Sequence, residues 1–353
     1  MKWPSQYIVC SALLISIAIA IGLWCWLPYT ENDDGEPNRI DRDQAASDVS
    51  DASDQPDMIR ILALRKHLLS MPEDSVARFE LAMKLLSLDK QMALQEFQLI
   101  PKESPQYLET QKRMAAIFIM SQQTSEAESI LKRLHVDYPD DFAVELSLAE
   151  LYTDQRFFQE ALPHIVKSIE LKPDRIESYL LHAWALEELG RFDEMREPLE
   201  IAIRIEPMHY YAHSLLGFAY LQSGQIELAY EHVSWCLRTD GKNGFVQETA
   251  AAVERERGNL DKAFEYAKSA MKLSPERLDP PLIAADILMY RKKPEEAYEL
   301  LKDRYEAGEN AIRFLGAFAR AASGCGHRSE AKNAFEKIEH IYLQKMENRR
   351  ENE

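Results

Sequence analysis

The sequence is poor in cysteine and glycine, with only four cysteines and 12 glycines among 353 residues. Two of the cysteines, Cys10 and Cys25, fall in an apolar N-terminal stretch, which leaves Cys236 and Cys325 for the rest of the chain. So few cysteines exclude a disulfide framework. We expect Cys236 and Cys325 to be small buried hydrophobes. The scarcity of glycine, beside abundant Leu, Ala, Glu, Lys and Arg, favours a mostly helical chain.

Positive charge is also in deficit. Acidic residues number 59 and basic residues 42, so the formal net charge is -17. A surface of that sign is repelled by nucleic-acid phosphates, and nucleic acid is therefore not expected as a partner. The acidic excess either keeps a large helical surface soluble or gives a preference for basic partners.

Motifs of catalysis and of cofactor binding are missing from the sequence as well. His209 and His213 have the spacing of metal ligands on one helix face, but no Glu follows His209, so the zinc-protease pattern fails. The sequence has no glycine-rich phosphate loop and no Gly-x-Ser-x-Gly elbow. His327 follows Cys325 and Gly326 without the second cysteine of a c-type haem site. We therefore expect a non-enzymatic protein with no cofactor and no metal.

One long apolar run is present near the N-terminus. Residues Ile8 to Leu27 carry no charged side chain, and about 20 helical residues span a hydrocarbon core of about 30 Å. Aromatic residues of the kind found at membrane interfaces flank the run; they are Trp3, Tyr7, Trp24, Trp26 and Tyr29. The run predicts a transmembrane helix within an N-terminal membrane anchor, residues 1–28. A cleaved signal peptide is the alternative, with a cleavage site at Ala18-Ile19-Ala20, although the apolar run continues beyond that site.

Charges on the two flanks of this run predict its orientation. Lys2 and the amino terminus lie on the short side, whereas the other flank begins with acidic residues and has its first positive charge at Arg39. Positively charged flanks stay in the cytoplasm. The bulk of the chain is therefore expected outside the cytoplasm, on the periplasmic side if the source is bacterial. Residues 29–57 are acidic and polar with almost no large apolar residue, which predicts a disordered linker.

A period of 34 residues runs through the rest of the chain. Prolines mark it first, and a glycine takes the same phase once: Pro105, Pro139, Pro173, Pro207, Gly241 and Pro275. Small residues share the period at Ala149, Ala183, Gly217, Ala251 and Ala285, and again at Ala161, Ala229, Ala263 and Ala297. Small side chains let two helices approach closely. Gly190, Gly224 and Gly258 fall where a first helix would turn into a second.

With these marks the sequence resembles the tetratricopeptide repeat (TPR) family, whose unit is a 34-residue helix-turn-helix. The resemblance covers Ser75 to about Tyr342 and gives about eight units. The terminal units are less regular, because Lys292 replaces the turn glycine and Glu309 replaces the opening proline. The resemblance implies an all-α solenoid, a right-handed superhelix, over residues 72–342. Residues 58–71 are expected to form a capping helix with Asp57 as its N-cap, and residues 343–353 a charged tail.

In the TPR family the second, fifth, ninth, twelfth and thirteenth positions of a unit face a concave groove that binds partner segments. In this sequence those positions hold a run of apolar and aromatic residues rimmed by carboxylates. The residues are Leu180, Trp184, Tyr211, Phe218, Leu221 and Phe245. Exposed aromatic residues in a groove indicate an anchoring site, although aromatic residues at helical spacing are also common in cores.

Some TPR proteins clamp a chaperone C-terminus with lysine, arginine and asparagine at set positions. Lys112 occupies one such position, but Ala116 and Ser147 stand where asparagine is required, so chaperone-tail recognition is not expected. The resemblance instead implies a membrane-tethered scaffold that binds proteins or peptide segments, probably best matched to assembly of a cell-envelope complex. The alternative is a cytoplasm-facing adaptor that regulates assembly or turnover of a membrane enzyme. Self-association of the array stays open.

Overall fold

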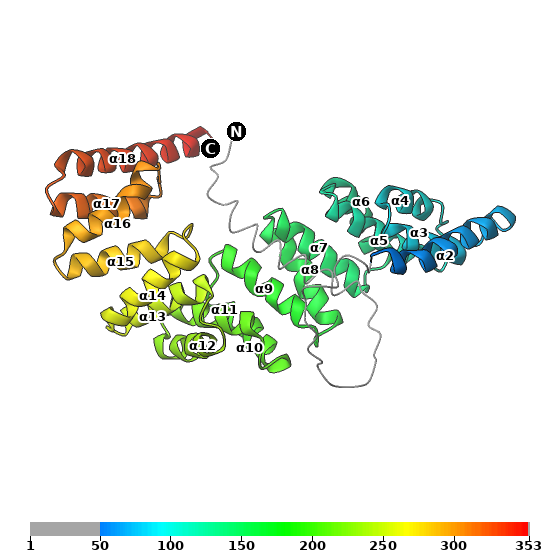
Figure 1. The fold of residues 1–353 in the computed structure, drawn as a ribbon, viewed down its shortest axis with the longest axis horizontal. Coiled ribbons are helices and arrows are strands. Elements are labelled where there is room, and N and C mark those ends of the chain that lie inside the picture. The colour runs from blue at the N-terminus through cyan, green and yellow to red at the C-terminus, as the bar shows by residue number, and fades with distance from the viewer. Residues whose placement is uncertain (1–49, 352–353) are drawn as a thin grey trace. The chain divides into compact units, whose positions relative to one another are not determined.

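The computed structural model describes residues 50–351 as a succession of α-helices, α2 to α18, with no strand in that part of the chain (Figure 1). The chain divides into two compact units, one ending at Leu181 and the other beginning at His182. The boundary falls within α9 (Ile176–Glu188). Each unit is an all-α helical repeat, as the 34-residue period predicts.

Unit 1 begins with α2 (Ser50–Ser70), which packs on α3. Its helices then follow in pairs, with each member of a pair packed against the other. The pairs are α3 (Ser75–Leu86) with α4 (Lys90–Gln98), α5 (Tyr107–Met120) with α6 (Thr124–Asp137), and α7 (Phe142–Asp154) with α8 (Phe158–Leu171). Asp74, Asp89 and Asp141 accept hydrogen bonds from the first backbone amides of α3, α4 and α7 and so fix where these helices start.

Unit 2 continues the same alternation. After α9 come α10 (Arg196–Ile205), α11 (Tyr210–Gln222), α12 (Ile226–Thr239), α13 (Gly244–Glu256) and α14 (Leu260–Leu273). The unit ends with α15 (Asp279–Tyr290), α16 (Pro294–Glu306), α17 (Ile312–Gly324) and α18 (Arg328–Glu351). The irregular sequence marks near Lys292 and Glu309 do not interrupt the alternation, because α15 to α18 form two further pairs around a common apolar cluster.

The turn between the two helices of a pair has the same backbone shape in successive repeats. Gly190, Gly224 and Gly258 have φ angles of 69°, 72° and 80°. The same left-handed conformation occurs at the non-glycine residues in phase with them, Gln122, Arg156 and Lys292, with φ angles of 58°, 64° and 59°. Glycine adopts this conformation without steric cost. The prediction that the turn glycines are left-handed is confirmed, and the fold imposes that shape even where glycine is missing.

Small residues lie at the helix crossings, as their spacing predicts. Ala149, Ala183, Ala251 and Ala161 are all 0% exposed. At Gly217 a Cβ atom would lie 2.8 Å from Cγ2 of Val233, so α11 and α12 are too close there for any side chain. Cys236 is also buried at 0% exposure, whereas Cys325 is half-buried, and both are free thiols.

The structure differs from the sequence predictions at both ends of the array. Helix α2 starts at Ser50 rather than at Met58, so Asp57 lies inside the helix and its carboxylate accepts a hydrogen bond from Nζ of Lys84, 2.7 Å away, instead of capping. At the other end, α18 continues to Glu351 through most of the predicted charged tail. This segment contains no helix breaker, and an i,i+4 ion pair supports the start of the helix at Lys332 and Glu336.

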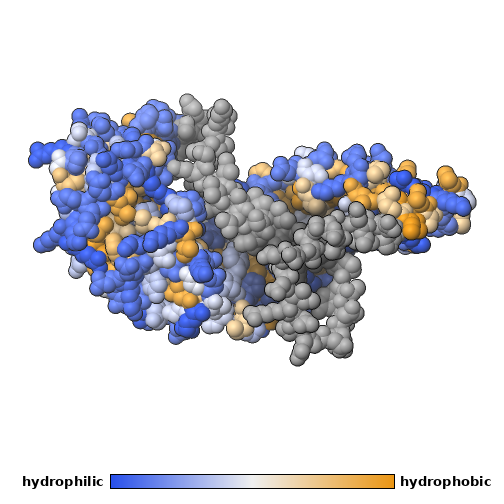
Figure 2. Space-filling model, in the orientation of Figure 1, coloured by the Kyte–Doolittle hydropathy of each residue, from blue (hydrophilic) through white to orange (hydrophobic). Residues whose placement is uncertain are grey.

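Helix α2 also has an apolar outer face. Figure 2 shows hydrophobic surface over this end of unit 1, and large side chains are exposed there at Met58, Ile59, Leu62 and Leu69. The predicted anchor and most of the predicted linker lie outside the described residues. Among the helices from Ser50 to Glu351, none combines the length and the apolar character that crossing a membrane requires.

Candidate partner-binding surface

Five of the six predicted groove residues lie in unit 2, on the first helices of three successive repeats. Trp184 is on α9, Phe245 is on α13, and α11 carries Tyr211, Phe218 and Leu221. Residues spaced by seven and three positions share one helix face, so the three side chains on α11 point the same way. Helices α11 and α13 pack directly against each other. We call these five residues the aromatic strip.

All five strip residues are half-buried, neither enclosed in the core nor fully exposed. The ring of Phe218 contacts Phe245 on the next repeat, with ring centroids 5.5 Å apart, and contacts Phe192 edge-on at 5.8 Å. These contacts hold Phe218 in place. The sixth predicted residue, Leu180, is different: it is only 4% exposed, so it belongs to the core of unit 1 and offers a partner little surface.

Charged groups lie beside the aromatic strip. Arg277 donates hydrogen bonds from Nε and Nη2 to the carboxylate of Glu248, with an Nη2 to Oε1 distance of 3.1 Å. The same guanidinium lies 5.2 Å from the ring centroid of Phe245, a cation–π arrangement. One turn after Trp184, burial and then the charge of Glu188 raise the pKa of Glu187 to about 7. The pKa of Tyr211 is raised by burial and by Glu187.

Comparison with known proteins places this arrangement among helical repeats. A crystal structure of a tetratricopeptide repeat protein from Parabacteroides merdae matches with a TM-score of 0.57 at 19% identity, over 67% of this chain and 93% of that one. A chain of the APC/C hetero-tetramer Cut9-Hcn1 matches with a TM-score of 0.54 at 15% identity, over 82% of this chain and 61% of that one. The chain has the TPR fold.

Sequence relatives agree with the fold. Human mitochondrial import receptor subunit TOM70 is 28% identical over 122 residues, which are 34% of this chain and 20% of TOM70. The match thus spans about a fifth of that relative's length. No protein-family model matches the chain. Proteins with TPR repeats are generally non-enzymatic interaction scaffolds, and no catalytic family is indicated by these comparisons.

The chaperone-clamp position of the TPR array is already occupied. Nζ of Lys112 lies 3.2 Å from a carboxylate oxygen of Asp141 and 3.4 Å from one of Glu109. A lysine held by two carboxylates is poorly placed to receive the carboxylate of a peptide, because that ligand would have to displace them. This geometry agrees with the absence of the asparagines that the clamp requires.

A pocket of ≈ 420 Å³ lies in unit 2 away from the strip, among α14, α15 and α16. Its walls are mainly apolar, with Phe264, Met271, Leu288 and Leu300 among the lining residues. None of the strip residues lines it. The candidate partner-binding surface is therefore a row of side chains across helices rather than this enclosed pocket.

Sequence reasoning overlooked Glu150 in unit 1. It lies on α7 exactly one repeat before Trp184, and the 34-residue spacing alone would have found it. Its side chain is half-buried but surrounded by protein. Burial, followed by the charges of Asp154 and Glu177, raises its pKa to about 8 from an ordinary 4.5. The ninth repeat position thus changes from acidic in unit 1 to aromatic in unit 2.

We expect Glu150→Gln to stabilise the protein increasingly as the pH rises. A carboxyl whose folded pKa is raised from 4.5 to about 8 binds more protons in the folded state between those values. Its contribution is full below the unfolded pKa and is lost as the pH rises through the folded pKa. Thermal unfolding from about pH 5 to about pH 8 should show the midpoint of Glu150→Gln gaining on wild type. The exposed Glu126→Gln serves as control, and parallel curves for wild type and Glu150→Gln would contradict the burial of this carboxyl.

Proposed function

We propose that this protein is a membrane-tethered scaffold whose aromatic strip holds a segment of a partner protein during assembly of a cell-envelope complex. The observation that carries the proposal is the strip itself: five large apolar side chains from three successive repeats, each half-buried, with Phe218 fixed between Phe192 and Phe245. Aromatic residues that are held rigidly but remain accessible lose little conformational entropy on binding, and they dominate the energetics of protein interfaces.

The segment that suits this surface is extended or helical and presents apolar anchors, because a helical groove typically receives such segments. The carboxylates of Glu187 and Glu248 beside the strip favour a segment that also carries positive charge. The raised pKa of Glu187 supports the same preference, since a cationic side chain placed next to it would lower that pKa and stabilise the charged form.

Protein binding is also what the names of two similar proteins describe. TOM70 is named as an import receptor subunit, and the Cut9-Hcn1 structure is a hetero-tetramer. For this chain, the uncharged run from Ile8 to Leu27 supports a membrane tether. A tether raises the effective concentration of the array near other membrane components, so a weak groove would suffice. A cytoplasm-facing adaptor is the second candidate, because Lys2 opposes Arg39 and Arg42 by a narrow margin.

Reporter fusions at the C-terminus test the tether and its orientation. In a bacterial host we expect an alkaline phosphatase fusion, which is active only outside the cytoplasm, to show activity and to sediment with membranes through an alkaline wash. Removal of residues 1–28 should release the fusion from membranes and abolish its activity, because both export and anchoring depend on the apolar run. Membrane attachment with an inactive phosphatase and a folded cytoplasmic reporter would favour the adaptor instead. Recovery of the full chain in the soluble fraction would contradict the tether.

A further inference from the structure

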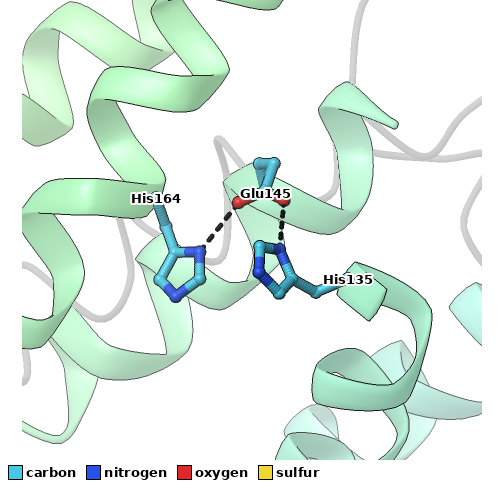
Figure 3. A group of neighbouring side chains, drawn as sticks. All are labelled: His135, Glu145 and His164. Carbon is cyan, nitrogen blue, oxygen red and sulfur yellow. Dashed lines mark hydrogen bonds and ion pairs between the residues drawn. The ribbon is translucent and has the colours of Figure 1, made fainter. Parts of the chain in front are cut away.

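Three side chains from three helices of unit 1 meet at one point (Figure 3). His135 comes from the last turn of α6, Glu145 from α7 and His164 from α8. Nδ1 of His135 lies 2.5 Å from Oε1 of Glu145, and Nδ1 of His164 lies 2.7 Å from Oε2 of the same carboxylate. One ligand atom from each residue can be chosen so that all three lie within 4.8 Å of one another.

The three side chains differ in their access to solvent. Glu145 is 0% exposed, His164 is 19% exposed and His135 is 43% exposed. The His164 ring stacks on Tyr152, with centroids 5.7 Å apart and an interplanar angle of 28°. The cluster therefore has a buried carboxylate and a braced imidazole on its inner side, and a second imidazole at the surface through which an ion can enter.

The other repeats show that Glu145 departs from a local rule. At the same position of the repeat, Tyr179 donates a hydrogen bond to the carbonyl of Pro173 at 3.0 Å, and Gln247 donates to the carbonyl of Gly241 at 2.6 Å. His213 makes the equivalent contact with the carbonyl of Pro207 at 3.0 Å. An ionised carboxylate has no hydrogen to donate. Glu145 thus gives up the bond that ties down the loop and faces two imidazoles instead.

Two imidazole nitrogens and one carboxylate oxygen are the protein ligands of Zn²⁺ in sites that keep a fourth position open. Zinc–ligand distances of about 2.0–2.2 Å place tetrahedral ligand atoms about 3.3 Å apart. The hydrogen-bonded contacts at Glu145 would have to lengthen by less than about 1 Å, and the surface position of His135 leaves room for that movement.

We propose that His135, Glu145 and His164 bind a divalent transition-metal ion of the Zn²⁺ type, with the fourth position open to water. On binding, the proton between each imidazole and the carboxylate leaves Nδ1, either for Nε2 of the same ring or for solvent, and each Nδ1 lone pair coordinates the ion. The ion connects α6 to α7 and α8, so it ties two consecutive repeats of unit 1 together.

Calorimetric titration of the full-length, chelator-treated protein with ZnCl₂ tests the proposal. We expect one high-affinity site per chain, and a thermal unfolding midpoint that rises by about 5 °C at a hundredfold excess over Kd. Glu145→Gln should lose the site and the midpoint shift. This variant is expected to fold, because glutamine at this position can donate to the loop carbonyl as Gln247 does.

The histidine pair in unit 2 provides a matched control. His213 and His232 lie 68 residues after Glu145 and His164, with their Nδ1 atoms 2.9 Å apart and no carboxylate between them. His232→Gln should therefore retain Zn²⁺ binding, whereas His164→Gln should weaken it at least about tenfold. The proposal is overturned if no stoichiometric binding occurs, or if Glu145→Gln and wild type bind Zn²⁺ equally. The cluster would then be a hydrogen-bonded clasp between repeats.

Discussion

Phe318→Ala is expected to destabilise unit 2 by about 4 kcal/mol, because removal of a fully buried phenylalanine loses its burial energy and leaves a cavity. Phe318 is 0% exposed on α17. Its ring stacks on Tyr305 with centroids 3.9 Å apart, and Tyr298 lies at 5.6 Å. Urea unfolding followed by circular dichroism measures the change in the free energy of unfolding.

Phe335→Ala is the matched control for this measurement. Phe335 is the same residue type on the neighbouring helix α18, but it is 53% exposed, so its replacement should change stability by no more than about 0.5 kcal/mol. Similar losses for the two variants, or a loss below about 1 kcal/mol for Phe318→Ala, would show that the last two helix pairs do not share a packed core. The test bears on the repeats whose sequence marks are weakest, at Lys292 and Glu309.

Combined Trp184→Ala and Phe218→Ala is expected to weaken partner binding about 30-fold or more, equivalent to about 2 kcal/mol, the cost of losing an interface hot spot. Both residues are half-buried members of the aromatic strip. Their removal should cost far less stability than Phe318→Ala and leave the helical circular dichroism spectrum nearly unchanged. Loss of the fold in this double variant would mean that these residues are core, and the strip would then no longer be a binding site.

Leu228→Ala provides the control for the binding loss. Leu228 is 39% exposed and lies on α12, the second helix of its repeat, whereas the strip lies on first helices. Because this leucine is outside the strip, its replacement should leave partner binding unchanged. An equal loss for Leu228→Ala would move the binding surface to the second helices of the repeats.

The repeat period made most of the fold predictable from sequence. The helix pairs, the left-handed turns at Gly190 and Gly224, and the buried alanines all follow from residues spaced by 34, since each repeat packs against its neighbours in the same way. The helix ends were less predictable. Helix α2 begins before Asp57 because that carboxylate pairs with Lys84 on α3, a contact between segments that no local capping pattern contains.

The candidate sites were predictable only in part. Sequence register found the half-buried residues of the strip, but it also selected Leu180, because a family position specifies a helix face and not how deeply a side chain is buried. The meeting of His135, Glu145 and His164 could not be read from their separations of 10 and 19 residues, which match no metal motif. It arises from packing between repeats, and the only local signal is an acidic residue where Tyr179 and Gln247 donate hydrogen bonds.

A quantitative pull-down from membranes tests the central claim most directly. Full-length wild type, the Trp184→Ala and Phe218→Ala double variant, and Leu228→Ala would be compared by mass spectrometry of the captured proteins. Binding through the aromatic strip predicts that one or more partners are recovered with wild type and Leu228→Ala and are selectively lost from the folded double variant. Identical sets of captured proteins for all three would contradict it.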